Sequence, residues 1–252
     1  MAYEDHSPSV SGEGRPVLLL HGLAGHRGEW ADLLGLLLPD GHRVITYDAR
    51  GHGESTRAPR DMTRAVNVRD AVALIRGLDL APVTLVGQSL GGLTALLTAA
   101  AHPELVRSLV LVEAGPDGPS PNLPSEIAGW LDSWPTPFES PSAGAEFFGH
   151  EAWGRGLERR ADGWYPRVAK QSMLAAVEEL AVHDYWGEWS RVSCPPLVVR
   201  GGSGTMRERE QTEMRERRPG TETVTVPGAG HDVHLDQPGR LYDEMKAFLA
   251  CR

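Results

Sequence analysis

The chain has 252 residues, a formal net charge of −9 at pH 7, 40% hydrophobic residues and 23% charged residues. This length and composition predict one soluble globular domain with room for a sizeable insertion. The negative charge gives no electrostatic attraction to nucleic acid or to an anionic membrane, so we predict neither as a partner.

Cysteine usage and the first residues bear on location. The two cysteines, Cys194 and Cys251, have no CxxC or metal-ligand spacing, which predicts reduced thiols and a cytoplasmic protein. Residues 1–15 are polar and contain no apolar segment typical of a signal peptide. Nearly all basic residues are arginine, a bias that points to a GC-rich bacterial genome.

Short apolar runs alternate with helical patterns along the chain. Because the runs are uniformly apolar, they predict a mostly parallel sheet with helices on both faces, an α/β fold. The predicted strands are residues 16–20, 43–47, 83–86, 109–112, 197–199 and 223–226, and the predicted helices are residues 29–38, 68–78, 93–100 and 241–249.

This alternation stops between Gly115 and Trp189, where prolines are frequent and no strand pattern is visible. The stretch is too long for a plain loop. We therefore predict a core domain of residues 1–115 and 191–252, and a helical cap of residues 116–190.

Six of the seven tryptophans fall in this stretch. Some are expected to fill the interior of the cap, and at least two are expected to face a substrate. The predicted pocket residues are His26, Trp130, Trp134, Trp153 and Trp186. Four cap arginines favour a solvated face, with a clamp for a substrate carboxylate as the lesser alternative: Arg155, Arg159, Arg160 and Arg167.

The segment from Gly87 to Gly91 reads Gly-Gln-Ser-Leu-Gly and fits G-x-S-x-G, directly between a predicted strand and a predicted helix. A sharp turn there would lift the Ser89 hydroxyl clear of the sheet and place it near a helix N-terminus, which favours developing negative charge. The pattern therefore predicts a nucleophilic serine. A glycine-rich turn with a capping serine is the structural alternative.

Two further loops supply the rest of a serine-hydrolase site. Gly22 follows the first core strand and allows close approach of the backbone, so the amides of Leu23 and Leu90 are predicted to form an oxyanion hole. His231 ends the sequence Gly-Ala-Gly-His after the last strand and is the predicted general base. His234 is expected to pack or cap a helix, and the pair lacks a third metal ligand.

Together these motifs resemble the α/β-hydrolase superfamily, from about Arg15 to Phe248. The segment Asp48–Ser55 looks like the D-x-R-G-x-G-x-S turn of that family, where it is structural. The resemblance implies eight mostly parallel strands with a cap inserted after the sixth. The first two of these strands would lie within residues 1–15 or be missing. The acyl-transfer mechanism that these residues predict needs no cofactor and no metal.

One departure from the family concerns the acid that orients the histidine. The turn from Arg200 to Thr205, where the family usually has an aspartate, contains no carboxylate. Glu113 ends the preceding strand, a position from which some lipases and thioesterases of the superfamily take their acid, so we predict Glu113. It could instead cap the first turn of the cap. Glu208 and Asp232 are lesser candidates.

These residues predict hydrolysis of an ester, thioester or lactone of a hydrophobic small molecule through an acyl-enzyme on Ser89, by a monomer or homodimer. A serine nucleophile argues against epoxide hydrolase and haloalkane dehalogenase chemistry, which needs a carboxylate there. Alternatives are a ligand-binding protein or pseudoenzyme with little turnover, and a cofactor-free perhydrolase or C–C hydrolase with the same triad.

Overall fold

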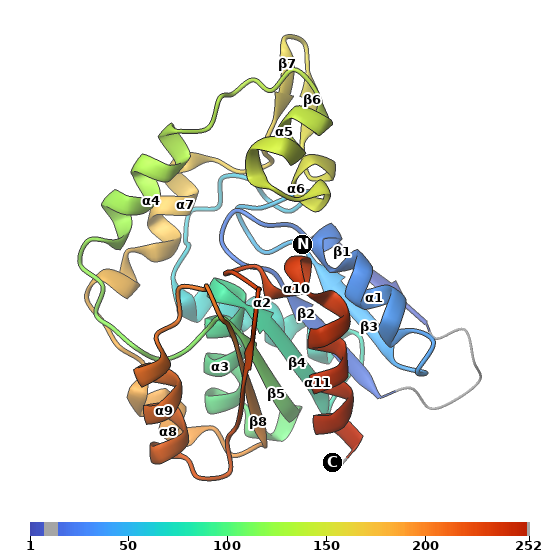
Figure 1. The fold of residues 1–252 in the computed structure, drawn as a ribbon, viewed down its shortest axis with the longest axis vertical. Helices are drawn as coiled ribbons and strands as arrows, with labels where there is room; N and C mark the ends of the chain where they lie inside the picture. The colour runs from blue at the N-terminus through green and yellow to red at the C-terminus, as the bar shows by residue number, and fades with distance from the viewer. Residues whose placement is uncertain (8–14, 251–252) are drawn as a thin grey trace.

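A seven-stranded sheet forms the centre of the molecule (Figure 1). The computed structural model describes residues 1–7 and 15–250. β1 pairs with β3 in antiparallel fashion, and the remaining neighbours in the sheet are parallel, which confirms the predicted α/β fold. In spatial order the strands are β1 (Tyr3–His6), β3 (Arg43–Tyr47), β2 (Pro16–Leu20), β4 (Val83–Gln88), β5 (Val106–Val112), β8 (Pro196–Gly201) and β9 (Glu222–Val226).

The N-terminal region supplies one strand to this sheet. The family resemblance places two strands before Pro16, and β1 is the one that the described residues contain. Residues 8–14 and Cys251 lie outside the described residues. Antiparallel pairing puts Tyr3 opposite Tyr47, so β1 extends the sheet at the edge beyond β3.

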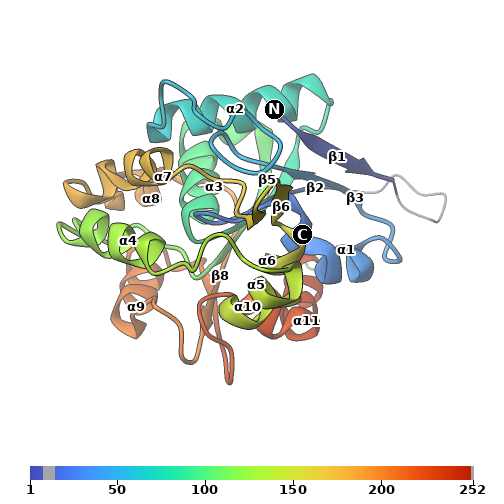
Figure 2. The ribbon, with the colours of Figure 1, turned by 90° about the horizontal axis from the view of Figure 1, so that it is seen from above.

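Helices cover both faces of the sheet, as Figure 2 shows from above. On one face lie η1 (Arg27–Trp30), α1 (Ala31–Leu37), α10 (Val233–Asp236) and α11 (Pro238–Ala250). On the other lie α2 (Arg64–Gly77), α3 (Ser89–Ala101), α8 (Trp186–Arg191) and α9 (Glu208–Arg217), while η2 (Pro103–Leu105) leads into β5.

The central strands contribute side chains to two separate cores, because successive residues point to opposite faces. Val17 and Leu19 of β2 pack in the cluster that includes Phe248 of α11. Leu18 and Leu20 pack in the cluster on the α2 and α3 side. Burial on both faces explains why the strands are uniformly apolar in sequence.

A cap segment, defined as residues 123–181, lies above the carboxyl ends of the strands (Figure 1). The sequence predicts a helical cap, but the segment also contains strands. A short antiparallel hairpin with Gly163 at φ +152° interrupts its helices. Its elements are α4 (Leu123–Asp132), α5 (Pro141–Phe148), α6 (Glu151–Arg155), β6 (Glu158–Arg160), β7 (Gly163–Tyr165), α7 (Lys170–Val177) and η3 (Glu179–Ala181).

Helix α8 packs with the core layers, although the sequence division places it in the cap. It contacts α3, and Trp189 is fully buried, with its indole Nε1 donating a hydrogen bond of 3.0 Å to the carbonyl of Met214 in α9. Residues 186–190 therefore belong to the helical layer beside the sheet.

Within residues 1–7 and 15–250, none of the helices combines the length and apolar character needed to span a bilayer.

Candidate active site

Ser89 stands on a sharp turn between β4 and α3. Its φ of +49° lies in the left-handed region, a costly conformation for a residue with a side chain. The flanking glycines make the turn possible. A Cβ at Gly87 would lie 2.5 Å from the carbonyl oxygen of Gly91, and one at Gly91 would lie 2.3 Å from that of Leu20. The strand, turn and helix thus have the geometry that the motif predicts.

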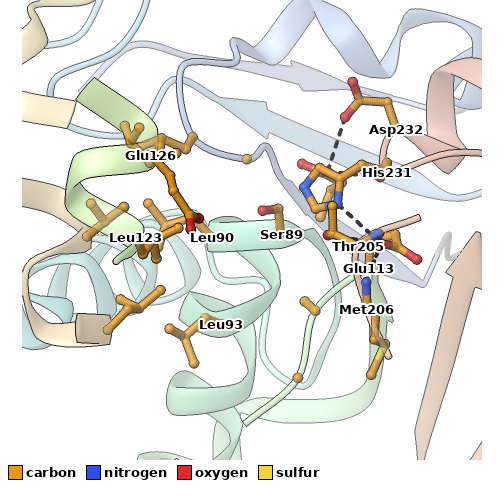
Figure 3. A pocket seen from close by; sticks show the side chains of 18 of the residues that line it. Ser89, Leu90, Leu93, Glu113, Leu123, Glu126, Thr205, Met206, His231 and Asp232 are labelled. Atoms are coloured by element: carbon orange, nitrogen blue, oxygen red, sulfur yellow. Dashed lines mark hydrogen bonds and ion pairs between the residues drawn. The ribbon is translucent and has the colours of Figure 1, made fainter. Parts of the chain in front are cut away.

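His231 lies on the loop after β9, and a carboxylate from another strand reaches its ring. Nδ1 of His231 is 3.2 Å from Oε2 of Glu113, which follows β5 directly and has a φ of +51°. The same nitrogen is 2.8 Å from Oγ1 of Thr205, and that hydroxyl is 3.3 Å from the same Glu113 oxygen. Figure 3 shows these three side chains together.

Glu113 is held ionised inside the protein. Its side chain is completely buried, and its oxygens accept hydrogen bonds from the backbone amides of Gly201 at 2.7 Å, Thr205 at 2.7 Å and Met206 at 3.0 Å. Burial alone would raise the pKa of Glu113, but the hydrogen bonds from His231 and the amides outweigh it and keep the pKa below its usual value. The carboxylate therefore stays charged at neutral pH.

The two lesser acid candidates lie elsewhere. Glu208 is exposed at the start of α9. Asp232 faces Gln88, whose Nε2 donates 3.2 Å hydrogen bonds to Asp232 Oδ1 and to the carbonyl of His231. Gln88 thereby ties the histidine loop to the end of β4.

A cavity of about 520 Å³ opens over Ser89 (Figure 3). Within the described residues, the Ser89 hydroxyl makes no hydrogen bond. The apolar wall comes from α3, the cap segment and the loop after β8: Leu90, Leu93, Leu123, Ile127, Trp130, Trp153, Val177, Leu180 and Met206. The polar lining includes Gln88, Ser89, Thr205, His231 and several carboxylates.

Leu23 and Leu90, predicted to give the oxyanion-hole amides, both line this cavity. The first turn of α3 leaves the Leu90 N–H without an intrahelical acceptor. The loop that carries Leu23 is fixed by a buried histidine, since His52 Nε2 accepts a 3.0 Å hydrogen bond from the amide of Ala24. His52 belongs to the segment that the family resemblance assigns to structure.

Of the five predicted pocket residues, Trp130 and Trp153 line the cavity and three side chains do not. Trp134 is buried in the cap interior, where its ring meets Trp130 edge-on at 4.8 Å. Trp186 lies on α8 under the guanidinium of Arg217 at 4.4 Å, away from the site because α8 packs with the core.

His26, the third predicted pocket residue outside the cavity lining, connects the core to the cap through hydrogen bonds. Its Nδ1 accepts a 3.1 Å hydrogen bond from the amide of Gly28 and caps η1. Its Nε2 donates to the carbonyl of Ala152 in α6 at 2.9 Å. Both ring nitrogens are therefore used in holding structure.

The four cap arginines do not reach the cavity either. Arg160 pairs with Glu158 at 2.7 Å, and Arg167 pairs with Glu54 at 2.9 Å. Arg155 and Arg159 are likewise outside the cavity lining. The structure offers no support for an arginine clamp above Ser89.

Two buried carboxyls in the cavity wall were not predicted from the sequence. Burial raises the pKa of Glu29, in η1, and of Glu210, in α9, to about 7 each. Oε2 of Glu29 is 3.5 Å from Nε2 of His234, a buried side chain that packs against Trp30. In sequence, both residues look like surface glutamates of short helices. Only the packing of the fold places their side chains in the interior.

Throughout the part of the chain that the structure describes, no three His, Cys, Asp or Glu residues converge as metal ligands do. His231 and His234, three residues apart in sequence, point to different partners, Glu113 and Glu29.

The fold and the loops around Ser89 define a hydrolase. The sequence profile of the Alpha/beta hydrolase family matches residues 17–244, and the chain belongs to this family. The sn-1-specific diacylglycerol lipase ABHD11 of Mus musculus is 29% identical over 262 residues, which covers 93% of this chain and 80% of that protein.

Two further likenesses extend over nearly the whole chain. The (E)-2-((N-methylformamido)methylene)succinate hydrolase of Acinetobacter baylyi is 26% identical over 248 residues, covering 94% of this chain and 91% of that protein. The crystal structure of an E-2-(acetamidomethylene)succinate hydrolase superimposes with a TM-score of 0.86 at 23% identity, covering 99% of this chain and all of the other. The structural likeness shows a shared fold.

Proposed function

We propose that this protein is a serine hydrolase that cleaves an ester, thioester or lactone of a hydrophobic small molecule through an acyl-enzyme on Ser89. One observation carries the proposal: His231, in the wall of the cavity over Ser89, has its Nδ1 3.2 Å from the buried carboxylate of Glu113. A carboxylate at Nδ1 keeps the proton on that nitrogen and leaves Nε2 free to act as a base.

The first half of the reaction forms the acyl-enzyme. The Ser89 hydroxyl turns toward His231, whose Nε2 takes the proton as Oγ bonds to the acyl carbon. Glu113 stabilises the imidazolium that results. The amides of Leu23 and Leu90 donate hydrogen bonds to the oxyanion, aided by the positive end of the α3 dipole. His231 then gives the proton to the departing alcohol or thiol.

Water completes the cycle. It attacks the acyl carbon while His231 takes one of its protons, and the bond between the acyl carbon and Ser89 Oγ breaks as the proton returns to the serine. The carboxylic acid leaves, and the enzyme is regenerated.

The cavity wall supports a hydrophobic substrate. Its aliphatic side chains and the rings of Trp130 and Trp153 give apolar contact area next to Ser89. The relatives are named for quite different compounds, a diacylglycerol and a succinate derivative. A succinate carries carboxylates, and no lysine or arginine is among the described residues of the cavity lining. We therefore do not extend that substrate to this chain.

The proposal is tested with a fluorophosphonate probe and a panel of 4-nitrophenyl esters of increasing chain length. We expect stoichiometric labelling of Ser89 and ester hydrolysis by the wild type, with both lost in Ser89→Ala. Ser190→Ala is a matched control, because Ser190 is exposed on α8, remote from the cavity. Labelling that persists in Ser89→Ala would overturn the assignment.

A ligand-binding protein or pseudoenzyme is the second candidate, motivated by the missing aspartate after β8. The contact between Glu113 and His231 favours the enzyme, because it supplies the acid from another strand. Ligand binding without labelling of Ser89 would favour the pseudoenzyme. Turnover of esters only with added peroxide would favour a perhydrolase, and cleavage of a 1,3-diketone would favour a C–C hydrolase.

The role of the cap segment and the cellular setting stay predictions. We propose that residues 123–181 form a lid unit over the core. A cytoplasmic location and a monomeric or homodimeric state are expected on sequence grounds alone.

A further inference from the structure

The charges that line the cavity all have one sign at neutral pH. No lysine or arginine is among the described residues that line it, and six carboxyl side chains are. They come from η1, from the loop after β5, from α4 and α9, and from the histidine loop: Glu29, Glu113, Asp117, Glu126, Glu210 and Asp232. They are thus spread around the wall of the site that holds Ser89.

Three of these carboxyls already have neighbours within the protein. Glu113 bonds to His231, Asp232 accepts from Gln88, and Glu29 lies beside His234. The other three are available to a substrate to different degrees. Asp117 is 3.5 Å from the guanidinium of Arg209, a long and exposed contact that neutralises it weakly.

Glu210 is nine-tenths buried, and only one of its two oxygens is used. Oε1 accepts a 3.0 Å hydrogen bond from the amide of Asp117, whereas Oε2 has no hydrogen-bond partner within the described residues. Oε2 is not fully buried and borders the open cavity, where its charge acts on a bound molecule. A cationic group in the cavity would therefore face an oxygen that accepts no hydrogen bond from the described residues.

Glu126 is the unpaired charge on the cap side. The residue is exposed, and its carboxylate has neither a hydrogen bond nor an ion pair among the described residues. Figure 3 shows its side chain reaching from α4 toward the space beside Leu90 and Ser89. The rings of Trp130 and Trp153 line the same cavity, and aromatic faces attract cations.

Apolar walls strengthen the effect of these charges, because a low-dielectric cleft focuses the field of carboxylates that line it. We propose that the cavity selects substrates by charge: it takes hydrophobic esters or thioesters that bear an ammonium group in preference to neutral ones, and it rejects those that bear a carboxylate or phosphate. This inference rests on the proposed hydrolysis at Ser89. It separates this chain from a hydrolase of dicarboxylates.

The test uses three 4-nitrophenyl esters of similar length: pentanoate, 4-(trimethylammonio)butanoate and the monoester of glutarate. The trimethylammonium charge does not change with pH, so the assay can run at pH 8, where Glu210 is ionised. Each kcat/KM is divided by the rate constant of uncatalysed hydrolysis, which removes the intrinsic reactivity of each ester. We expect the order cationic, neutral, anionic, with about tenfold or more between the first and last.

Two variants attribute the selectivity to the cavity. Glu126→Gln should lower, several-fold, the ratio of the corrected kcat/KM for the cationic ester to that for the anionic ester. Glu151→Gln makes the same change of charge on exposed α6, outside the cavity, and should leave the ratio as in the wild type. Raising the salt concentration should also narrow the wild-type ratio.

Equal corrected rates for the three esters, or a preference for the glutarate ester, would overturn the charge selection. A ratio that Glu126→Gln changes no more than Glu151→Gln does would also overturn it. Failure of the proposed function looks different: none of the three esters would be hydrolysed, and the fluorophosphonate would not label Ser89.

Discussion

Oε2 of Glu113 lies 3.2 Å from Nδ1 of His231, although the two residues are 118 positions apart in the chain. The parallel pairing of β5 with β8, and of β8 with β9, makes this contact possible, because it brings the ends of the three strands to the same edge of the sheet. Three backbone amides then fix the carboxylate. The loop after β8 thus contributes amides and the hydroxyl of Thr205, and the neighbouring strand contributes the acid.

Glu113→Gln should leave the fold intact, because the amide is nearly isosteric with the carboxylate. It should lower kcat by about a hundredfold to ten-thousandfold, since the imidazolium loses its counter-charge and the histidine tautomer is no longer fixed. KM should change little, because the acid acts through His231. Steady-state kinetics with a 4-nitrophenyl ester measures both constants, and circular dichroism checks the fold. Normal turnover by this variant would exclude Glu113 as the acid.

Thr205 offers a sharper test of how the ring is held. Its hydroxyl lies between His231 Nδ1 and Glu113 Oε2, at 2.8 and 3.3 Å. Thr205→Val removes the hydroxyl but keeps the amide that bonds to Glu113, so the direct contact between the ring and the carboxylate remains. We expect kcat to fall by about tenfold or less, the effect of one hydrogen bond, and well short of the loss in Glu113→Gln.

Thr205→Ser is the matched control for this prediction, because it keeps the hydroxyl and should retain near wild-type kcat. A loss in Thr205→Val as large as that in Glu113→Gln would mean that the hydroxyl, and not the direct contact, transmits the effect of the acid.

Sequence patterns predicted the strand-and-helix framework because burial on both faces of a parallel sheet leaves uniformly apolar strands, such as residues 16–20. They also predicted the turn at Ser89, since only glycines fit beside it. The hairpin at β6 and β7 was missed because its strands are only three residues long. Local patterns of that length carry little signal.

Pocket residues were harder to predict, because which way a cap side chain faces depends on how whole helices pack. Trp153 and Trp186 are both tryptophans in short helices, yet the first lines the cavity and the second lies under Arg217 beside the core. Glu29 and Glu210 were missed for the same reason. Nothing in a helical pattern of mixed charges marks the one carboxyl that is buried.

Glu29 makes a prediction about stability. Burial raises its pKa to about 7, above the value of about 4.3 expected in the unfolded chain, so the folded protein holds a proton that the unfolded chain releases. This contribution to stability is complete below about pH 4 and is lost as the pH rises through 7. Glu29→Gln lacks the ionisation and keeps an acceptor for the amide of His26.

The free energy of unfolding of Glu29→Gln minus that of the wild type should therefore be about 1–3 kcal/mol more positive at pH 8 than at pH 5. Urea denaturation at both pH values measures it, and the exposed Glu151→Gln is the control that should show no such change. An equal difference between Glu29→Gln and wild type at the two pH values would show that Glu29 ionises normally.

His52 should produce the opposite dependence. Burial, together with the neighbouring ring of His21, lowers its pKa to about 3, against about 6.5 in an unfolded chain. Folding therefore requires the neutral ring, in which Nδ1 donates to the carbonyl of Arg50 at 2.9 Å and Nε2 accepts from the amide of Ala24 at 3.0 Å. The stability that the neutral ring contributes is complete above about pH 6.5 and falls as acid protonates the unfolded chain.

His52→Gln leaves the Ala24 amide poorly satisfied and should cost about 1–3 kcal/mol of the free energy of unfolding at pH 7. Between pH 6 and pH 5, however, the His52 side chain lowers the free energy of unfolding of the wild type by about 1.4 kcal/mol per pH unit. The variant has no such decrease, so the two free energies of unfolding should converge. His183→Gln, at an exposed position, is the control and should parallel the wild type. Because Ala24 follows Leu23, His52→Gln should also lower kcat at pH 7 by displacing the oxyanion loop, while fluorophosphonate labelling of Ser89 is slowed but still complete. A constant stability gap from pH 7 to pH 5 would show that His52 titrates alike in the folded and unfolded chains.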